Sequence, residues 1–84
     1  MPKTLKREEA IEKLCRLAAE QVGADPSGVT LDTDLFADLG FDSLNAVEYV
    51  MEIEEEFDLT IPDEQADEVK TVRQALERLL PMLT

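Results

Sequence analysis

Histidine is absent from the 84-residue sequence, and cysteine occurs once, at Cys15. Without histidine the chain lacks the side chain that most often exchanges protons near neutral pH. Cys/His zinc sites and an intramolecular disulfide are excluded as well, so the core must hold without cross-links. A chain of this length has room for about one domain. We therefore expect a single domain over residues 1–84 that is not an enzyme.

Long apolar runs are also missing. No such run follows the positive charges at the N-terminus, so the sequence predicts neither a signal peptide nor a membrane-spanning helix. We expect a cytoplasmic protein in a reducing compartment, without a membrane partner.

Basic residues are scarce, with 8 Lys and Arg against 20 Asp and Glu and a formal net charge of -12. No Lys or Arg lies between Arg16 and Lys70, a stretch that holds 16 acidic residues. Such a surface repels nucleic acids and anionic membranes, and it favours basic surface patches of other proteins as partners. Apolar residues interrupt the acidic stretch at helical spacing, which predicts a folded acidic face rather than a disordered tail.

Strand-type alternation of apolar and polar residues is not found, and helical periodicity dominates. The predicted fold is all-α, a small four-helix bundle of three main helices and one short one. The expected main helices cover about residues 4–22, 43–57 and 72–80, with Pro81 ending the last, and residues 63–68 are expected to form a single helical turn or two.

The segment 23–41, between the first two predicted helices, carries Gly23, Pro26, Gly28 and Gly40 and reads as a long ordered loop. A loop of that length in a small domain is usually functional. Before the last helix, Thr71 and Gln74 fit the capping-box pattern, in which each side chain satisfies the other residue's backbone N–H.

The most informative segment is Asp42-Ser43-Leu44, where the long loop meets a strongly periodic helix. Unpaired N–H groups and the helix dipole favour a negative charge at the start of a helix, so they would stabilise a phosphate attached to Ser43. The alternative is that Ser43 only caps the helix. Asp and Ser are both preferred caps, and a helix has one cap position, which leaves one of the two spare.

Three enzyme-like interpretations fail. Ser43 has no histidine to activate it, and Gly40-Phe41-Asp42-Ser43-Leu44 is not a GxSxG elbow, which argues against a hydrolase. A calcium loop counted from Asp32 puts Ala37 where glycine is required, so no specific metal site is predicted. The four residues Glu48, Glu52, Glu55 and Glu56 are typical of a solvated face rather than of paired catalytic acids.

The run Asp38-Leu39-Gly40-Phe41-Asp42-Ser43-Leu44 resembles the prosthetic-group site of acyl carrier proteins. The resemblance covers about residues 32–76 closely and continues through Val47-Glu48, Val50-Met51, Glu54-Glu55-Glu56-Phe57, Ile61-Pro62-Asp63-Glu64, Ala66 and Thr71-Val72. It implies a 4′-phosphopantetheine arm from coenzyme A, joined to the Ser43 hydroxyl by a phosphodiester and flanked by Asp42 and Leu44. The thiol of the arm carries acyl groups as thioesters between enzymes.

The resemblance also implies partners. A phosphopantetheinyl transferase must do the attachment chemistry, and ketosynthases, acyltransferases and other acyl-processing enzymes of fatty-acid or related polyketide and secondary lipid biosynthesis exchange the acyl group. The second helix offers them a strip of apolar and acidic residues: Asp42, Leu44, Val47, Glu48, Met51 and Glu54. The residues expected to line a space for the acyl chain are Val47, Val50, Ile61, Ala66 and Val69. The alternative, open for each of them individually, is an ordinary place in the hydrophobic core.

Two residues depart from the pattern of fatty-acid carriers. Asn45 stands where those carriers usually have an acid, and Phe41 where they usually have a small residue. These departures favour a specialised carrier. The other class of function left open is an acidic interaction module, such as a nucleic-acid mimic or inhibitor, without a cofactor. In either case we expect a monomer.

Overall fold

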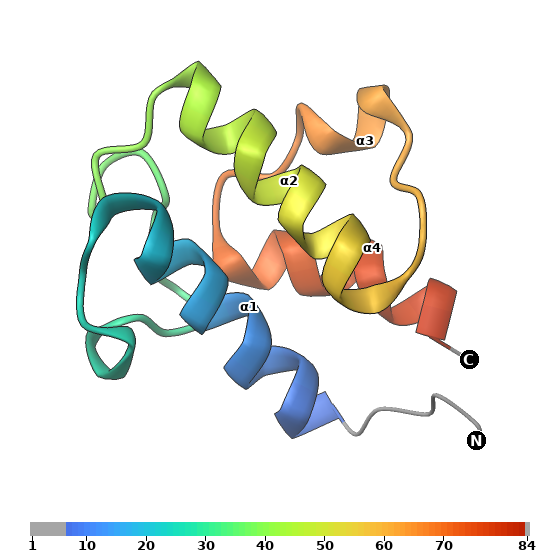
Figure 1. The fold of residues 1–84 in the computed structure, drawn as a ribbon, viewed down its shortest axis with the longest axis horizontal. Coiled ribbons are helices and arrows are strands. Elements are labelled where there is room, and N and C mark those ends of the chain that lie inside the picture. The colour runs from blue at the N-terminus through green and yellow to red at the C-terminus, as the bar shows by residue number, and fades with distance from the viewer. Residues whose placement is uncertain (1–6, 84) are drawn as a thin grey trace.

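The computed structural model describes residues 7–83, and these residues form helices joined by ordered loops (Figure 1). The elements are α1 (Arg7–Val22), a short 3-10 helix η1 (Pro26–Gly28), α2 (Ser43–Phe57), α3 (Asp63–Ala66) and α4 (Val72–Leu83). The described part of the chain contains no strand, only one isolated bridge between Asp34 and Thr71. The all-α prediction is confirmed. Residues 4–6, predicted to begin the first helix, lie outside the described residues.

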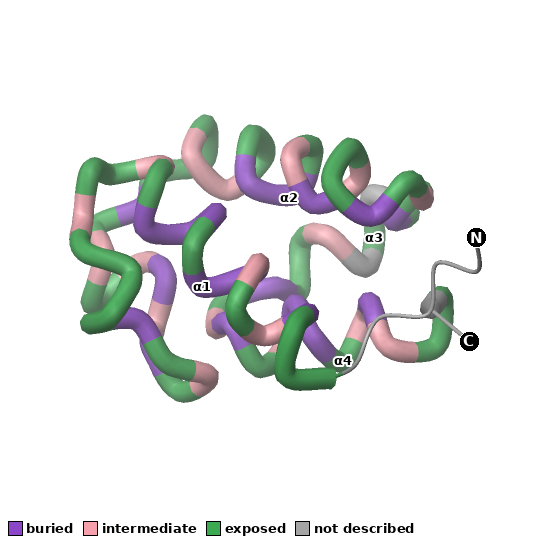
Figure 2. Tube along the Cα trace, turned by 60° about the horizontal axis from the view of Figure 1, so that its bottom comes forward, coloured by how far each residue is buried: buried purple, intermediate pink, exposed green. Residues whose placement is uncertain are grey.

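The hydrophobic core lies where α1 faces α2 and α4, and buried positions recur along the inner side of each helix (Figure 2). Leu14, Tyr49, Ile53 and Leu79 are among the side chains with almost no exposed surface. The Tyr49 hydroxyl donates a hydrogen bond of 2.9 Å to the Leu14 carbonyl oxygen, so this buried polar group has a partner. Burial of the phenol raises its pKa.

The loop between η1 and α2 is fastened to the start of α4 by backbone hydrogen bonds. The Leu35 amide donates to the Lys70 carbonyl over 2.8 Å, and the Arg73 amide donates to the Leu31 carbonyl over 2.9 Å. Within the loop, Asp34 Oδ1 accepts hydrogen bonds from the amides of Phe36 and Ala37. These bonds hold the loop backbone against the turn that precedes α4.

The predicted capping box of α4 is confirmed. Thr71 Oγ1 accepts from the Gln74 amide over 3.2 Å, and Gln74 Oε1 accepts from the Thr71 amide over 3.1 Å. None of the helices within residues 7–83 has the length and apolar character that a bilayer span requires.

Of the two lengths expected for the short helix, one turn or two, the structure has the single turn, and α3 ends at Ala66. The predicted end of the last helix is wrong. Pro81 lies inside α4, which continues to Leu83. Proline removes one backbone donor and crowds the carbonyl four residues earlier, but its fixed φ is itself helical. Because Leu79 is buried and anchors the preceding turn, the chain keeps its helical path past Pro81.

Candidate functional site at the start of α2

The start of α2 is capped by Asp42 and not by Ser43. Asp42 Oδ1 accepts a hydrogen bond of 2.8 Å from the Asn45 amide, and Asn45 Oδ1 accepts one of 3.1 Å from the Asp42 amide. This reciprocal pair is a capping box, and it uses no atom of the Ser43 side chain. The interpretation of Ser43 as the cap is therefore wrong, and Ser43 is the spare residue of the two.

Ser43 occupies the first helical position and is exposed. The first backbone N–H groups of a helix have no partner within the helix, and the dipole gives this end a partial positive charge. Asp42 satisfies only the Asn45 amide among them. The hydroxyl of Ser43 is thus free of capping duty in a position that favours an attached anion.

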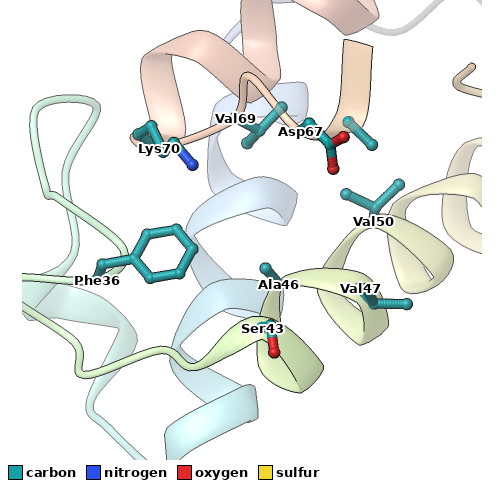
Figure 3. A pocket seen from close by; sticks show the side chains of 9 residues that line it. Phe36, Ser43, Ala46, Val47, Val50, Asp67, Val69 and Lys70 are labelled. Atoms are coloured by element: carbon teal, nitrogen blue, oxygen red, sulfur yellow. The ribbon is translucent and has the colours of Figure 1, made fainter. Parts of the chain in front are cut away.

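A cleft lies beside Ser43, between α2 and the segment that joins α3 to α4 (Figure 3). Its volume is about 260 Å³. The residues that line it are Phe36, Ser43, Ala46, Val47, Val50, Ala66, Asp67, Val69 and Lys70. Most of these side chains are apolar, so the cleft offers an apolar space next to an exposed hydroxyl.

A second hollow of about 390 Å³ continues along α2 and shares part of its wall with the first. The shared residues are Val47, Val50, Ala66 and Asp67. Ile61 lines only the second hollow, and Val69 only the first. All five residues expected to line an acyl space therefore lie on this groove. That they contact an acyl chain stays a prediction.

The outer side of α2 presents apolar side chains to solvent. Leu44 is 63% exposed, Val47 55% and Met51 54%, and Glu48 beside them is exposed as well. The predicted strip is thus present on one helix face, although nothing yet tests its role in partner binding. Exposure of three large apolar residues on one helix face of a small protein is typical of an interaction surface.

Glu54, the last member of the predicted strip, has a structural contact that the sequence did not reveal. Its Oε2 accepts a hydrogen bond of 2.7 Å from the Ile61 amide and so fastens the segment that follows α2. Glu54 is partly buried, unlike Glu48. Within the strip, Glu48 is therefore the acid available to a partner without loss of an internal bond.

Both residues that depart from the pattern of fatty-acid carriers have internal roles. Phe41 is 5% exposed and packs edge-on against Tyr49, with ring centroids 5.7 Å apart. Asn45 completes the capping box, and its Nδ2 donates to Gln21 Oε1 of α1 over 3.4 Å. Phe41 therefore belongs to the core, and Asn45 links the start of α2 to the end of α1.

Sequence reasoning missed Phe36 and Lys70 as residues of the cleft. Lys70 Nζ lies 5.1 Å from the centroid of the Phe36 ring, a cation–π arrangement. The two residues are 34 positions apart in the sequence and meet only because the loop is fastened to the start of α4. No local pattern in either segment indicates this contact.

Other groups with displaced pKa values belong to the body of the fold. Burial raises the pKa of the Cys15 thiol, which is 7% exposed on the inner side of α1. A hydrogen bond of 2.8 Å from Lys13 lowers the pKa of Glu56. Glu56 is thereby part of an ion pair between α2 and α1.

Comparison with known proteins agrees with this arrangement. Residues 12–79 match the family described as "Phosphopantetheine attachment site". The chain is 42% identical over 73 residues to an acyl carrier protein of Guillardia theta, which covers 87% of this chain and 90% of that one. It is also 42% identical over 71 residues to an acyl carrier protein of Rubrobacter xylanophilus, covering 84% and 88%.

The fold is similar to the solved structure of an acyl carrier protein from Enterococcus faecalis, with a TM-score of 0.75, 30% identity, and 92% of this chain and 98% of that chain covered. The match to the family extends over most of the described residues and includes the start of α2. The chain therefore belongs to the acyl carrier proteins, the family that holds 4′-phosphopantetheine covalently.

Proposed function

We propose that Ser43 carries the 4′-phosphopantetheine arm, and that the protein shuttles acyl groups as thioesters between enzymes of fatty-acid biosynthesis or a related lipid pathway. At the start of α2, Asp42 caps the helix and the exposed Ser43 hydroxyl takes no part in the capping box, and this observation carries the proposal. Ser43 also lines the apolar cleft. An exposed oxygen with no structural duty suits covalent attachment.

Attachment requires only an oxygen from this chain. The bond between Ser43 Oγ and phosphorus forms as the pyrophosphate bond of coenzyme A breaks; adenosine 3′,5′-bisphosphate leaves, and the hydroxyl proton passes to a base of the transferase. Because the transferase supplies the base, the absence of histidine from this chain is no obstacle. When attached, the arm provides a terminal thiol for the acyl group. The chain is accordingly a carrier and not a catalyst.

Partner enzymes are proposed to dock on the outer side of α2 through Leu44, Val47, Glu48 and Met51. Exposed apolar side chains give contact area, and the acidic surroundings steer encounters with basic patches on the partner. Glu54 is proposed as a weaker contributor, since docking on its carboxylate competes with the bond to the Ile61 amide.

The groove between α2 and the α3–α4 segment is proposed to shelter the acyl chain. Its apolar walls match hydrocarbon, and a groove lined by Val47, Val50, Ile61, Ala66 and Val69 removes part of such a chain from water. The choice between fatty-acid and polyketide cargo does not rest on Phe41 or Asn45, because both have internal contacts that explain them.

The test is the mass of the protein after incubation with a phosphopantetheinyl transferase and coenzyme A. The parent protein should gain one phosphopantetheinyl group and Ser43→Ala should gain none. Ser27→Ala is the matched control because Ser27 and Ser43 are the two serines of the chain, and Ser27 lies in η1. This control should be modified like the parent. A parent protein that gains no mass would favour the acidic interaction module instead.

A further inference from the structure

Of the residues that the structure describes, Lys70 is the one basic residue that lines the cleft beside Ser43. In the sequence, Lys70 follows a stretch of 53 residues, 17–69, that contains no Lys or Arg. The side chain is held over the Phe36 ring, with Nζ 5.1 Å from the ring centroid (Figure 3). The cleft therefore has a cation in its lining, on the wall across from the first turn of α2 (Figure 3).

The other basic residues within 7–83 are engaged or distant. Lys13 and Arg16 pair with Glu56, Arg73 pairs with Asp32, and Arg78 pairs with Glu68. Arg7 begins α1 at the end of that helix far from the start of α2 (Figure 1). In the described part of the chain, no carboxylate forms a salt bridge with Lys70. Among residues 7–83, Lys70 is thus the basic residue beside the start of α2 whose charge is available.

An anion attached to Ser43 meets strong repulsion. The chain carries a formal charge of -12, and Asp42 directly precedes Ser43, while Asp67 lines the same cleft. The helix dipole offsets only part of this repulsion, since a helix end is worth about half an elementary charge. A full positive charge on the same cleft is the strongest available compensation.

We propose that Lys70 holds the phosphodiester formed on Ser43, and that Phe36 positions the Lys70 ammonium for this role. The proposal rests on the proposed function, because it requires the arm to be on Ser43. An ammonium group has three N–H donors, so contact with the ring face leaves donors for phosphate oxygens. The backbone bond from Leu35 to the Lys70 carbonyl fixes the two side chains beside each other. Lys70 is accordingly a binding residue for the arm, and Phe36 is a positioning residue.

A merely structural Lys70, packed on Phe36, predicts a different result. Loss of such packing would lower the melting temperatures of the unmodified and the modified protein equally. Loss of a phosphate contact would lower the melting temperature of the modified protein more. The difference in melting temperature between the modified and unmodified forms of one variant therefore separates the two roles.

The experiment compares this difference in the parent, Lys70→Gln, Lys70→Arg and Lys13→Gln at low ionic strength. Lys13→Gln is the matched control, since it removes the same charge at the opposite end of α2, where Lys13 pairs with Glu56. Modification should lower the melting temperature of Lys70→Gln by about 1–8 °C more than that of the parent, the range for an exposed ion pair in a domain of this size. Lys70→Arg and Lys13→Gln should match the parent, and the extra loss should vanish near 1 M salt.

The phosphorus resonance of the modified protein provides a second readout, and it should shift in Lys70→Gln but not in Lys13→Gln. Equal melting differences in all four proteins together with an unmoved resonance would overturn the role of Lys70. A parent protein without the added mass would instead overturn the proposed function, and this inference with it. If the transferase does not modify Lys70→Gln, Phe36→Leu takes its place: it keeps the lysine but removes the ring, and it should show the same change at smaller size.

Discussion

Replacing Asp42 and Ser43 separately by alanine distinguishes the structural residue from the chemical one at the start of α2. Asp42→Ala removes the acceptor of the 2.8 Å bond from the Asn45 amide and leaves that amide to solvent. Loss of an N-cap of this type costs about 1 kcal/mol, within a range of about 0.5–2 kcal/mol. For a domain of this size, 1 kcal/mol corresponds to a fall in melting temperature of about 4–8 °C.

Ser43→Ala should behave differently. Ser43 is the first helical residue and takes no part in the capping box, and alanine is the best helix former, so stability should change by no more than about 0.5 kcal/mol in either direction. Thermal unfolding followed by far-ultraviolet circular dichroism measures both effects on unmodified protein. Asp42→Asn is the control that retains a capping oxygen while it removes the charge, and it should lie close to the parent.

The same proteins are then offered coenzyme A and the transferase. Ser43→Ala should be fully folded and unmodified, whereas Asp42→Asn should be folded and open to modification. A loss of stability in Ser43→Ala as large as that in Asp42→Ala would refute the reasoning, because it would mean that the serine hydroxyl also holds the helix start.

Four further predictions follow from the surface and the core. Glu48→Lys should slow association with partner enzymes, and this loss of rate should shrink as salt is added. Met51→Ala should instead speed dissociation, at any salt concentration. Stopped-flow binding measures both rates, and identical behaviour of the two variants would contradict these separate roles. Salt, and Mg²⁺ more efficiently, should raise the melting temperature by screening the net charge of -12; a calorimetric scan that is indifferent to both would count against it. Cys15 should react with a thiol reagent far more slowly in native than in denatured protein, since burial also raises its pKa, and equal rates would show that the thiol is accessible. Because the pKa of Tyr49 is raised in the folded state, the contribution of Tyr49 to stability should be complete below about pH 10, its pKa in the unfolded chain, and should decline above that pH. Denaturant unfolding of Tyr49→Phe should show a smaller decline of stability above about pH 10. Equal declines in the parent and the variant would refute this prediction.

The helices could be predicted from the sequence because their signals are local. In α2 the apolar residues recur at helical spacing, and they form a buried row with Val50 and Ile53 and an exposed row with Leu44 and Met51. The Thr71 capping box is equally local, since three residues separate donor and acceptor. Pro81 misled the prediction because the rule on proline ignores how firmly the preceding turn is anchored.

The candidate site was only partly predictable. Ser43 stood out from the sequence, but the choice between Ser43 and Asp42 as the cap depends on backbone dihedrals that composition does not fix. The contact of Phe36 with Lys70 depends on the docking of a loop onto α4, a long-range event. The bond between Glu54 and the Ile61 amide has the same character, because a turn must first bring the two together.

The exposed apolar face of α2 has a consequence for how copies of this protein behave toward one another. Leu44, Val47 and Met51 stay in water whenever no partner is bound, and such surfaces ordinarily promote self-association. Each copy also carries a formal charge of -12, so two copies that approach face to face repel each other before their apolar groups touch. We therefore expect that copies of this protein stay apart in solution, while the exposed face of α2 can still bind basic proteins. The acidic surface thus prevents self-association through the exposed apolar residues of α2, even at high protein concentration.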